Sequence, residues 1–125
     1  MDESLTLTVW EVDIIVLDLI KLHLEEVVVG EEEFLDLLKN SLSLNVTEKK
    51  RVIDAVPTLS QFQFDELKKV FLEERVKFRE LAGEHPEDIK KLLKKQQEEW
   101  LTLGEIYKNE QAKKAIEWQD EQKID

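Results

Sequence analysis

The stretch QFQFDELKKVFLEERVKFRELAGEHPEDIKKLL, residues 61–93, decides the fold. In its first part apolar residues recur at spacings of three, four and seven, which is the period of one helix face, and Glu74 is the one polar residue in that series. The apolar members are Phe64, Leu67, Phe71, Phe78 and Leu81. This pattern predicts a long amphipathic helix over residues 61–82.

The same stretch also contains a helix end and a helix start. Gly83 is a typical residue just after a helix, and Pro86, followed by Glu87 and Asp88, is typical of a first helical turn. Helices joined by so short a turn usually pack antiparallel. Residues 57–125 are therefore predicted to form a long, coiled-coil-like helical hairpin.

The second helix of this hairpin is predicted to run from Pro86 to about Gln122. At about 1.5 Å per residue it would span roughly 55 Å, against roughly 33 Å for its partner, so part of it must overhang or bend. We expect a bend at Gly104, because glycine costs about 1 kcal/mol in a helix interior. Its inward stripe is predicted to hold Ile89, Leu93, Trp100, Leu103 and Tyr107, with Gln96 as a polar break.

The N-terminal part predicts a different kind of helix. Thr8 and Glu11 form a capping box, and the residues from Val9 to Val29 are apolar over most of a helix circumference, which predicts a central, buried helix ending at Gly30. A β-strand is the alternative, because many of these residues are β-branched. No Gly, Pro or Asn lies between Val9 and Val29 to turn a hairpin, so helix is favoured. Residues 4–9 alternate and could form a short strand or an extended lead-in.

Two shorter helices complete the prediction. Three glutamates at 31–33 open one, and Asn45 or Thr47 caps another over Glu48–Val56, which Pro57 ends. Ser60 and Gln63 form a capping box for the hairpin. The sequence thus predicts an all-α fold of four to five helices in one domain, residues 1–125, with acidic aliphatic helices in 1–56 and the hairpin in 57–125.

The charge distribution excludes several classes of partner. Residues 1–46 carry 11 acidic residues and 2 lysines, a net charge of −9, and the rest carries −2 of the total of −11. This charge repels phosphate backbones, so no nucleic-acid partner is expected. Charged residues interrupt Val9–Val29, which excludes a membrane span. With no cysteine and no signal-peptide pattern, the expected location is cytoplasmic.

No motif in the chain indicates catalysis. There is no cysteine, no Gly-x-Ser-x-Gly elbow and no glycine-rich phosphate loop. His23 and Glu26 form a single i, i+3 pair, whereas a di-metal bundle needs two Glu-x-x-His motifs and two more glutamates. The spacing of Glu31–Glu33 does not match a calcium loop. We therefore predict a protein that is not an enzyme, with no metal and no cofactor.

Interaction is the predicted role. Tryptophan and other aromatic residues are enriched at binding hot spots, and the predicted interface is Phe71, Phe78, Trp100, Tyr107 and Trp118. These residues would meet a helix of another protein or of a second copy. The alternative hypothesis is an acidic inhibitor or decoy of a basic nucleic-acid-binding protein. Its acidic patch would be Glu25, Glu26, Glu31, Glu32, Glu33 and Asp36.

Overall fold

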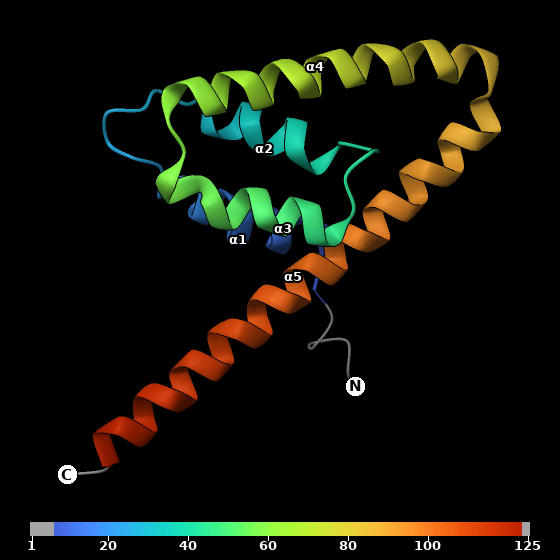
Figure 1. Cartoon of the computed structure of the whole chain (residues 1–125). Helices are drawn as coiled ribbons and strands as arrows, with labels where there is room; N and C mark the ends of the chain where they lie inside the picture. The colour runs from blue at the N-terminus through green and yellow to red at the C-terminus, as the bar shows by residue number, and fades with distance from the viewer. Residues whose placement is uncertain (1–6, 124–125) are drawn as a thin grey trace, which may run out of the picture.

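The structure, a computed structural model, describes residues 7–123, with side chains up to residue 116. Its elements are α1 (Val9–Ile20), α2 (Glu31–Lys39), α3 (Val46–Ala55), the short 3-10 helix η2 (Val56–Thr58), α4 (Gln61–Glu84) and α5 (Pro86–Lys123). Over these residues there are five α-helices and no strand, which confirms the predicted all-α fold (Figure 1).

The helix starts follow the capping residues seen in the sequence. Thr8, Asn45 and Ser60 each accept a hydrogen bond from the backbone N–H three residues later. In each case the side chain of that later residue accepts a hydrogen bond from the capping residue's backbone N–H. The predicted starts at Thr8 and Ser60 are confirmed, and Asn45, not Thr47, caps α3.

The first helix is much shorter than predicted. It ends at Ile20, and Val27–Val29 belong to no helix or strand, so Gly30 is the N-cap of α2 and not the end of the first helix. β-Branched residues such as Val27–Val29 lose side-chain freedom in a helix. In the structure the distant side chain of Gln61 binds the Val28 backbone in a non-helical segment. Gln61 accepts a hydrogen bond from the Val28 N–H at 2.7 Å and donates one to the Val28 carbonyl at 3.0 Å.

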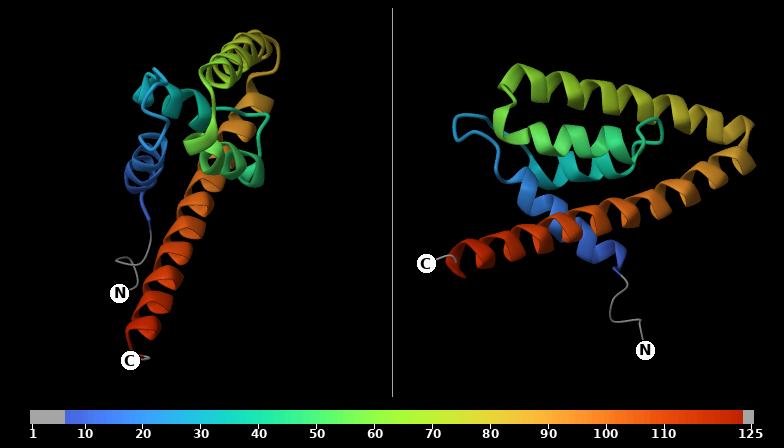
Figure 2. Two further views of the ribbon diagram at one scale, coloured as in Figure 1. Left: turned by 60° about the vertical axis from the view of Figure 1, so that its left-hand side comes forward. Right: turned by 60° about the horizontal axis from the view of Figure 1, so that its bottom comes forward.

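Helices α4 and α5 form an open hairpin. They meet at His85 and diverge from there, with α2 against α4, and with α1 and α3 against α5 (Figures 1 and 2). On α4 the buried rings of Phe64 and Phe71 pack on Phe34 of α2, at centroid distances of 5.1 and 6.0 Å. Gly83 lies inside α4, which continues to Glu84. The widening space between the long helices is thus filled by the shorter ones.

Helix α1 buries only one of its faces. Val12, Val16 and Ile20 are fully buried, but Trp10 is 70% exposed and Ile14 also faces solvent. The prediction of a helix buried on nearly all sides was therefore wrong. A helix that crosses α5 on one side, as α1 does in Figure 2, leaves its other side open whatever its composition.

Gly104 is a point of close approach and not a bend. Helix α5 runs through it without a break, and its backbone lies against α1. A Cβ atom at Gly104 would overlap Val12 Cγ2 and lie 3.1 Å from Leu7 Cδ1. The absence of a side chain allows the two helices to approach this closely.

Gly104→Ala should therefore destabilise the fold. Overpacking costs about 1–3 kcal/mol, which outweighs the gain in helix propensity of about 1 kcal/mol. Val12→Ala in the same chain removes the overlapping methyl groups. Urea unfolding should show that the double variant is more stable than the sum of the two single effects predicts. Additivity within about 0.5 kcal/mol would contradict the close contact.

Candidate functional site

Three of the five predicted interface aromatics lie in the core. Trp100 is 0% exposed, and Phe71 and Tyr107 are also buried. Trp100 Nε1 donates to Asp13 Oδ1 at 2.9 Å, and the Tyr107 hydroxyl donates to Asp54 Oδ1 at 2.8 Å. Trp100 and Tyr107 thus hold α5 to α1 and α3, whereas Phe71 of α4 packs on Phe34 of α2. All three side chains are buried within the chain and have no free surface for a partner. Phe78 is half-buried, and the Trp118 side chain lies outside the described residues.

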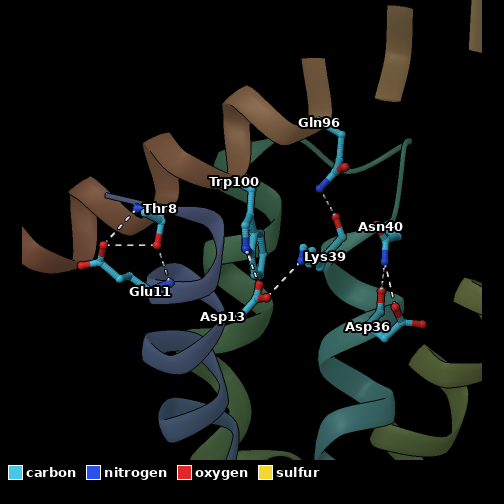
Figure 3. Close-up of polar contacts among 8 residues, drawn as sticks. All are labelled: Thr8, Glu11, Asp13, Asp36, Lys39, Asn40, Gln96 and Trp100. Carbon is cyan, nitrogen blue, oxygen red and sulfur yellow. Dashed lines mark hydrogen bonds and ion pairs between the residues drawn. The ribbon is translucent and has the colours of Figure 1, made fainter. Parts of the chain in front are cut away.

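A buried polar network joins α2, α3 and α5 near Trp100. The carbonyl of Lys39, the last residue of α2, accepts hydrogen bonds from Lys49 Nζ at 2.9 Å and from Gln96 Nε2 at 2.6 Å. The Lys39 amine in turn contacts Asp13 Oδ2 at 3.1 Å (Figure 3). Carbonyls at a helix end lack intrahelical partners. Lys49 and Gln96 therefore complete the C-terminus of α2.

Burial of Lys49 changes its titration. Removal from water lowers the pKa of the amine from 10.5 to about 8, and the carboxylates of Glu99 and Glu74 partly oppose this. Its Nζ lies 5.9 Å from the centre of the Trp100 ring. The amine is enclosed by protein atoms and bonded to a backbone carbonyl. This geometry fits a structural cap, and the pKa shift is a consequence of that position.

The predicted acidic patch is partly neutralised by the chain itself. Glu33 pairs with Lys68 at 2.7 Å and Asp36 pairs with Arg75 at 3.0 Å. Glu31 contacts His23 Nε2 at 2.9 Å. Within residues 7–116, Glu25, Glu26 and Glu32 are exposed and make no ion pair. The patch is thus three free carboxylates among three paired ones.

His23 contacts Glu31 of α2 in the structure. The sequence predicted that His23 and Glu26 share a helix. In the structure α1 ends at Ile20, so neither residue is in it. The hydrogen bond to the Leu24 carbonyl and, to a smaller extent, the Glu31 carboxylate raise the pKa of the imidazole above 6.5, and burial opposes them. Among the described residues no group of three side chains is placed to hold a metal ion.

An apolar groove lies between α3 and the start of α4. It encloses about 530 Å³. Its walls are formed by Leu44, Glu48, Arg51, Val52, Ala55, Leu59, Phe62, Gln63, Glu66, Leu67 and Val70. Phe62 is 71% exposed and Val70 is 55% exposed at its edge. We call this feature the α3/α4 groove.

The sequence contained a signal for this groove, but it lies next to the stronger apolar series of α4 that includes Phe64 and Phe71. Phe62 and Val70 are eight residues apart, which places them on one side of a helix, next to the seam of Phe64 and Phe71. The pattern alone cannot tell which of two neighbouring apolar stripes is covered. In the structure α2 covers the stripe of Phe64 and Phe71, and the stripe of Phe62 and Val70 stays open.

A second cavity of about 350 Å³ lies where α4 and α5 diverge. It contains Phe78, Ile89 and Leu93, but Asp36, Arg75 and other polar side chains also line it. The Asp36–Arg75 ion pair occupies its edge. This cavity is smaller and more highly charged than the α3/α4 groove, and it is therefore the weaker candidate for an apolar partner.

Comparison with known proteins adds no functional assignment. No protein-family model, curated protein or solved structure matches this chain. In the part of the chain that the structure describes, every helix is too short or too polar to cross a bilayer. Function must be inferred from the groove, the carboxylates and the network described above.

Proposed function

We propose that this protein is a non-enzymatic interaction module that binds an amphipathic helix in the α3/α4 groove. One observation carries the proposal: Phe62 and Val70 expose large apolar surfaces beside a groove walled by Val52, Leu59 and Leu67. Single exposed hydrophobic residues are common, but contiguous apolar patches mark interaction sites.

The shape and chemistry of the groove fit a helix. Its two walls are themselves helices, and their facing rows leave a channel into which a third helix can place residues at i, i+4 and i+7. Phe62 supplies a large aromatic contact, the kind that dominates binding energy at hot spots. Glu48, Arg51 and Glu66 at the edges provide charges of both signs to orient a partner.

The acidic-decoy hypothesis has less support. Glu33 and Asp36 make ion pairs within the chain, which lowers the negative potential that a basic partner would meet, and Glu31 contacts His23. Salt separates the two mechanisms. Binding through apolar helix packing should persist at roughly 0.5 M salt, where the Debye length is about 4 Å, whereas binding through exposed carboxylates should be lost.

A synthetic amphipathic peptide tests the proposal directly. The probe is a helix of about 18 residues with Leu on one face and uncharged Gln on the other, so that charge plays no part. Fluorescence anisotropy should show binding to the wild-type chain. Phe62→Glu should weaken it at least about tenfold, because a charge would then be buried under the peptide.

Trp10→Glu is the matched control. Trp10 is 70% exposed, as Phe62 is, and it lies on α1, outside the α3/α4 groove. The Trp10→Glu variant should bind the peptide as the wild type does. If both variants bind equally well, or if Trp10→Glu loses binding and Phe62→Glu keeps it, the groove is not the docking site.

A further inference from the structure

The segment between α1 and α2, residues 21–30, is held to the rest of the fold by side chains. It contains neither helix nor strand and forms the loop at the left of Figure 1. One tie is Gln61, which binds the Val28 backbone. Another is His23, whose ring contacts the first residue of α2. Segments without regular secondary structure open at low cost, so each tie has a large effect on the order of this one.

Both ring nitrogens of His23 face oxygen atoms that accept hydrogen bonds. Nδ1 lies 2.9 Å from the Leu24 carbonyl oxygen, and Nε2 lies 2.9 Å from Glu31 Oε2. Neither a carbonyl nor an ionised carboxylate has a proton to donate, so both nitrogens must donate, which only the imidazolium can do. A neutral ring, in either tautomer, would set a nitrogen lone pair against an oxygen. For this reason the Leu24 carbonyl and the Glu31 carboxylate raise the pKa of the imidazole.

The other neighbours of the ring leave Glu31 as its charged partner. From α4, Phe64 meets the imidazole edge-on at a centroid distance of 6.5 Å. Within residues 7–116, Glu25 and Glu26 of the same segment are exposed and make no ion pair. The His23 side chain is only 16% exposed, so water cannot easily replace a contact that it loses.

The carbonyl that His23 binds also closes a turn. Leu24 accepts a hydrogen bond from the Val27 N–H at 3.0 Å, and the Val27 side chain is buried. Val28 follows directly, and its backbone is bound to Gln61 at the start of α4. A change at His23 therefore acts on the position of Val27 and on the contact with α4.

We propose that His23 is a pH-sensitive clasp, whose imidazolium holds residues 21–30 to the start of α2 and whose loss of one ring proton loosens that segment. Its pKa is above 6.5 in the closed segment, so the closed segment binds the second proton more tightly than the open one. The clasp is thus fully closed below about pH 6.5 and weakens as the pH rises through the higher pKa. It shares no residue with the α3/α4 groove and stands apart from the proposed function.

Two measurements on the wild-type chain between about pH 5 and 9 test the clasp. Imidazole nitrogen chemical shifts should show that His23 titrates with a pKa above 6.5. Amide hydrogen exchange, corrected for its intrinsic pH dependence, should show that Val27 and Val28 lose protection over the same range. Linkage sets the size of the loss, which is about tenfold for each pH unit by which the measured pKa exceeds 6.5.

Three variants assign the effect to this ring. His23→Phe keeps a ring beside Phe64 but removes both donors, so protection of the segment should be low and independent of pH. Glu31→Gln keeps an acceptor but removes the charge, so the pKa of His23 and the loss of protection should both decrease. His85→Asn, at the exposed turn between α4 and α5, should change neither. A His23 pKa at or below 6.5, constant protection in the wild type, or a pH-dependent loss that persists in His23→Phe would overturn the clasp.

Discussion

Replacement of Trp100 by alanine should lower the free energy of unfolding by about 3–5 kcal/mol. The side chain is 0% exposed, and it packs in the core shared by α1, α3 and α5. Its loss leaves a large cavity and also removes the donor to Asp13 Oδ1. Both effects act in the folded state, so the loss should appear as a lower urea midpoint with an unchanged slope.

Trp10→Ala is the control for this prediction. The two residues are chemically identical, but Trp10 is 70% exposed and should change stability by no more than about 0.5 kcal/mol. Circular dichroism during urea unfolding compares the two variants. Trp100→Phe, which keeps most of the volume but loses the hydrogen bond, should fall between them. Equal losses for the two alanine variants would show that Trp100 does not occupy the core.

Replacement of Lys49 by methionine should change the pH dependence of stability. In the wild type the pKa of Lys49 is about 8 in the folded state and 10.5 when unfolded, so between these values the unfolded chain binds more protons. Stability therefore rises with pH across this window, by about 3 kcal/mol in all. The methionine variant lacks this rise, and it should be more stable than the wild type at pH 7, where the buried charge is costly.

Tyr107 must be separated from this effect. Burial, together with its hydrogen bond to Asp54, raises the pKa of the phenol above 10.0, so the folded state holds this proton longer and stability falls above that pH. The wild type and Lys49→Met share this fall, and the difference between their unfolding curves isolates Lys49. Urea unfolding at several pH values from 7 to 10 measures it. Parallel pH profiles would mean that the amine is not buried in its charged form.

The helix starts could be predicted from the sequence because they depend on neighbours in the chain. At Thr8 and Ser60 a side chain, its backbone and a residue three positions later form a complete set of hydrogen bonds. Pro86 likewise starts α5 with an acidic first turn. Such features need no information about the rest of the fold.

The features that were missed depend on residues far apart in the chain. The chain after α1 is held by Gln61, whose side chain makes two hydrogen bonds to the Val28 backbone from 33 positions away. Glu74, the polar residue in the α4 seam, accepts hydrogen bonds from the Leu42 N–H at 3.0 Å and from Ser41 at 3.2 Å. Gly104 is explained by the close approach of Val12. A local pattern gives no sign of these partners.

The candidate site was harder to predict than the fold, for a related reason. Composition identified the aromatic residues as the main source of contact area, but it could not tell a tryptophan inside the core from one on the surface. Trp100 and Trp10 differ in exposure because α1 crosses α5 over one and turns the other outward. Phe62 is exposed because α2 covers its neighbour Phe64 and leaves Phe62 open.

The central claim is that this molecule acts by packing a helix into the α3/α4 groove. The most direct measurement is a titration of the wild-type chain with the Leu/Gln peptide, followed by backbone amide chemical shifts. We predict shifts concentrated on α3 and on the first half of α4, around Val52 and Phe62, at low salt and at roughly 0.5 M salt alike. Shifts confined to α1 or to the acidic residues 25–36, or no shifts at all, would contradict it.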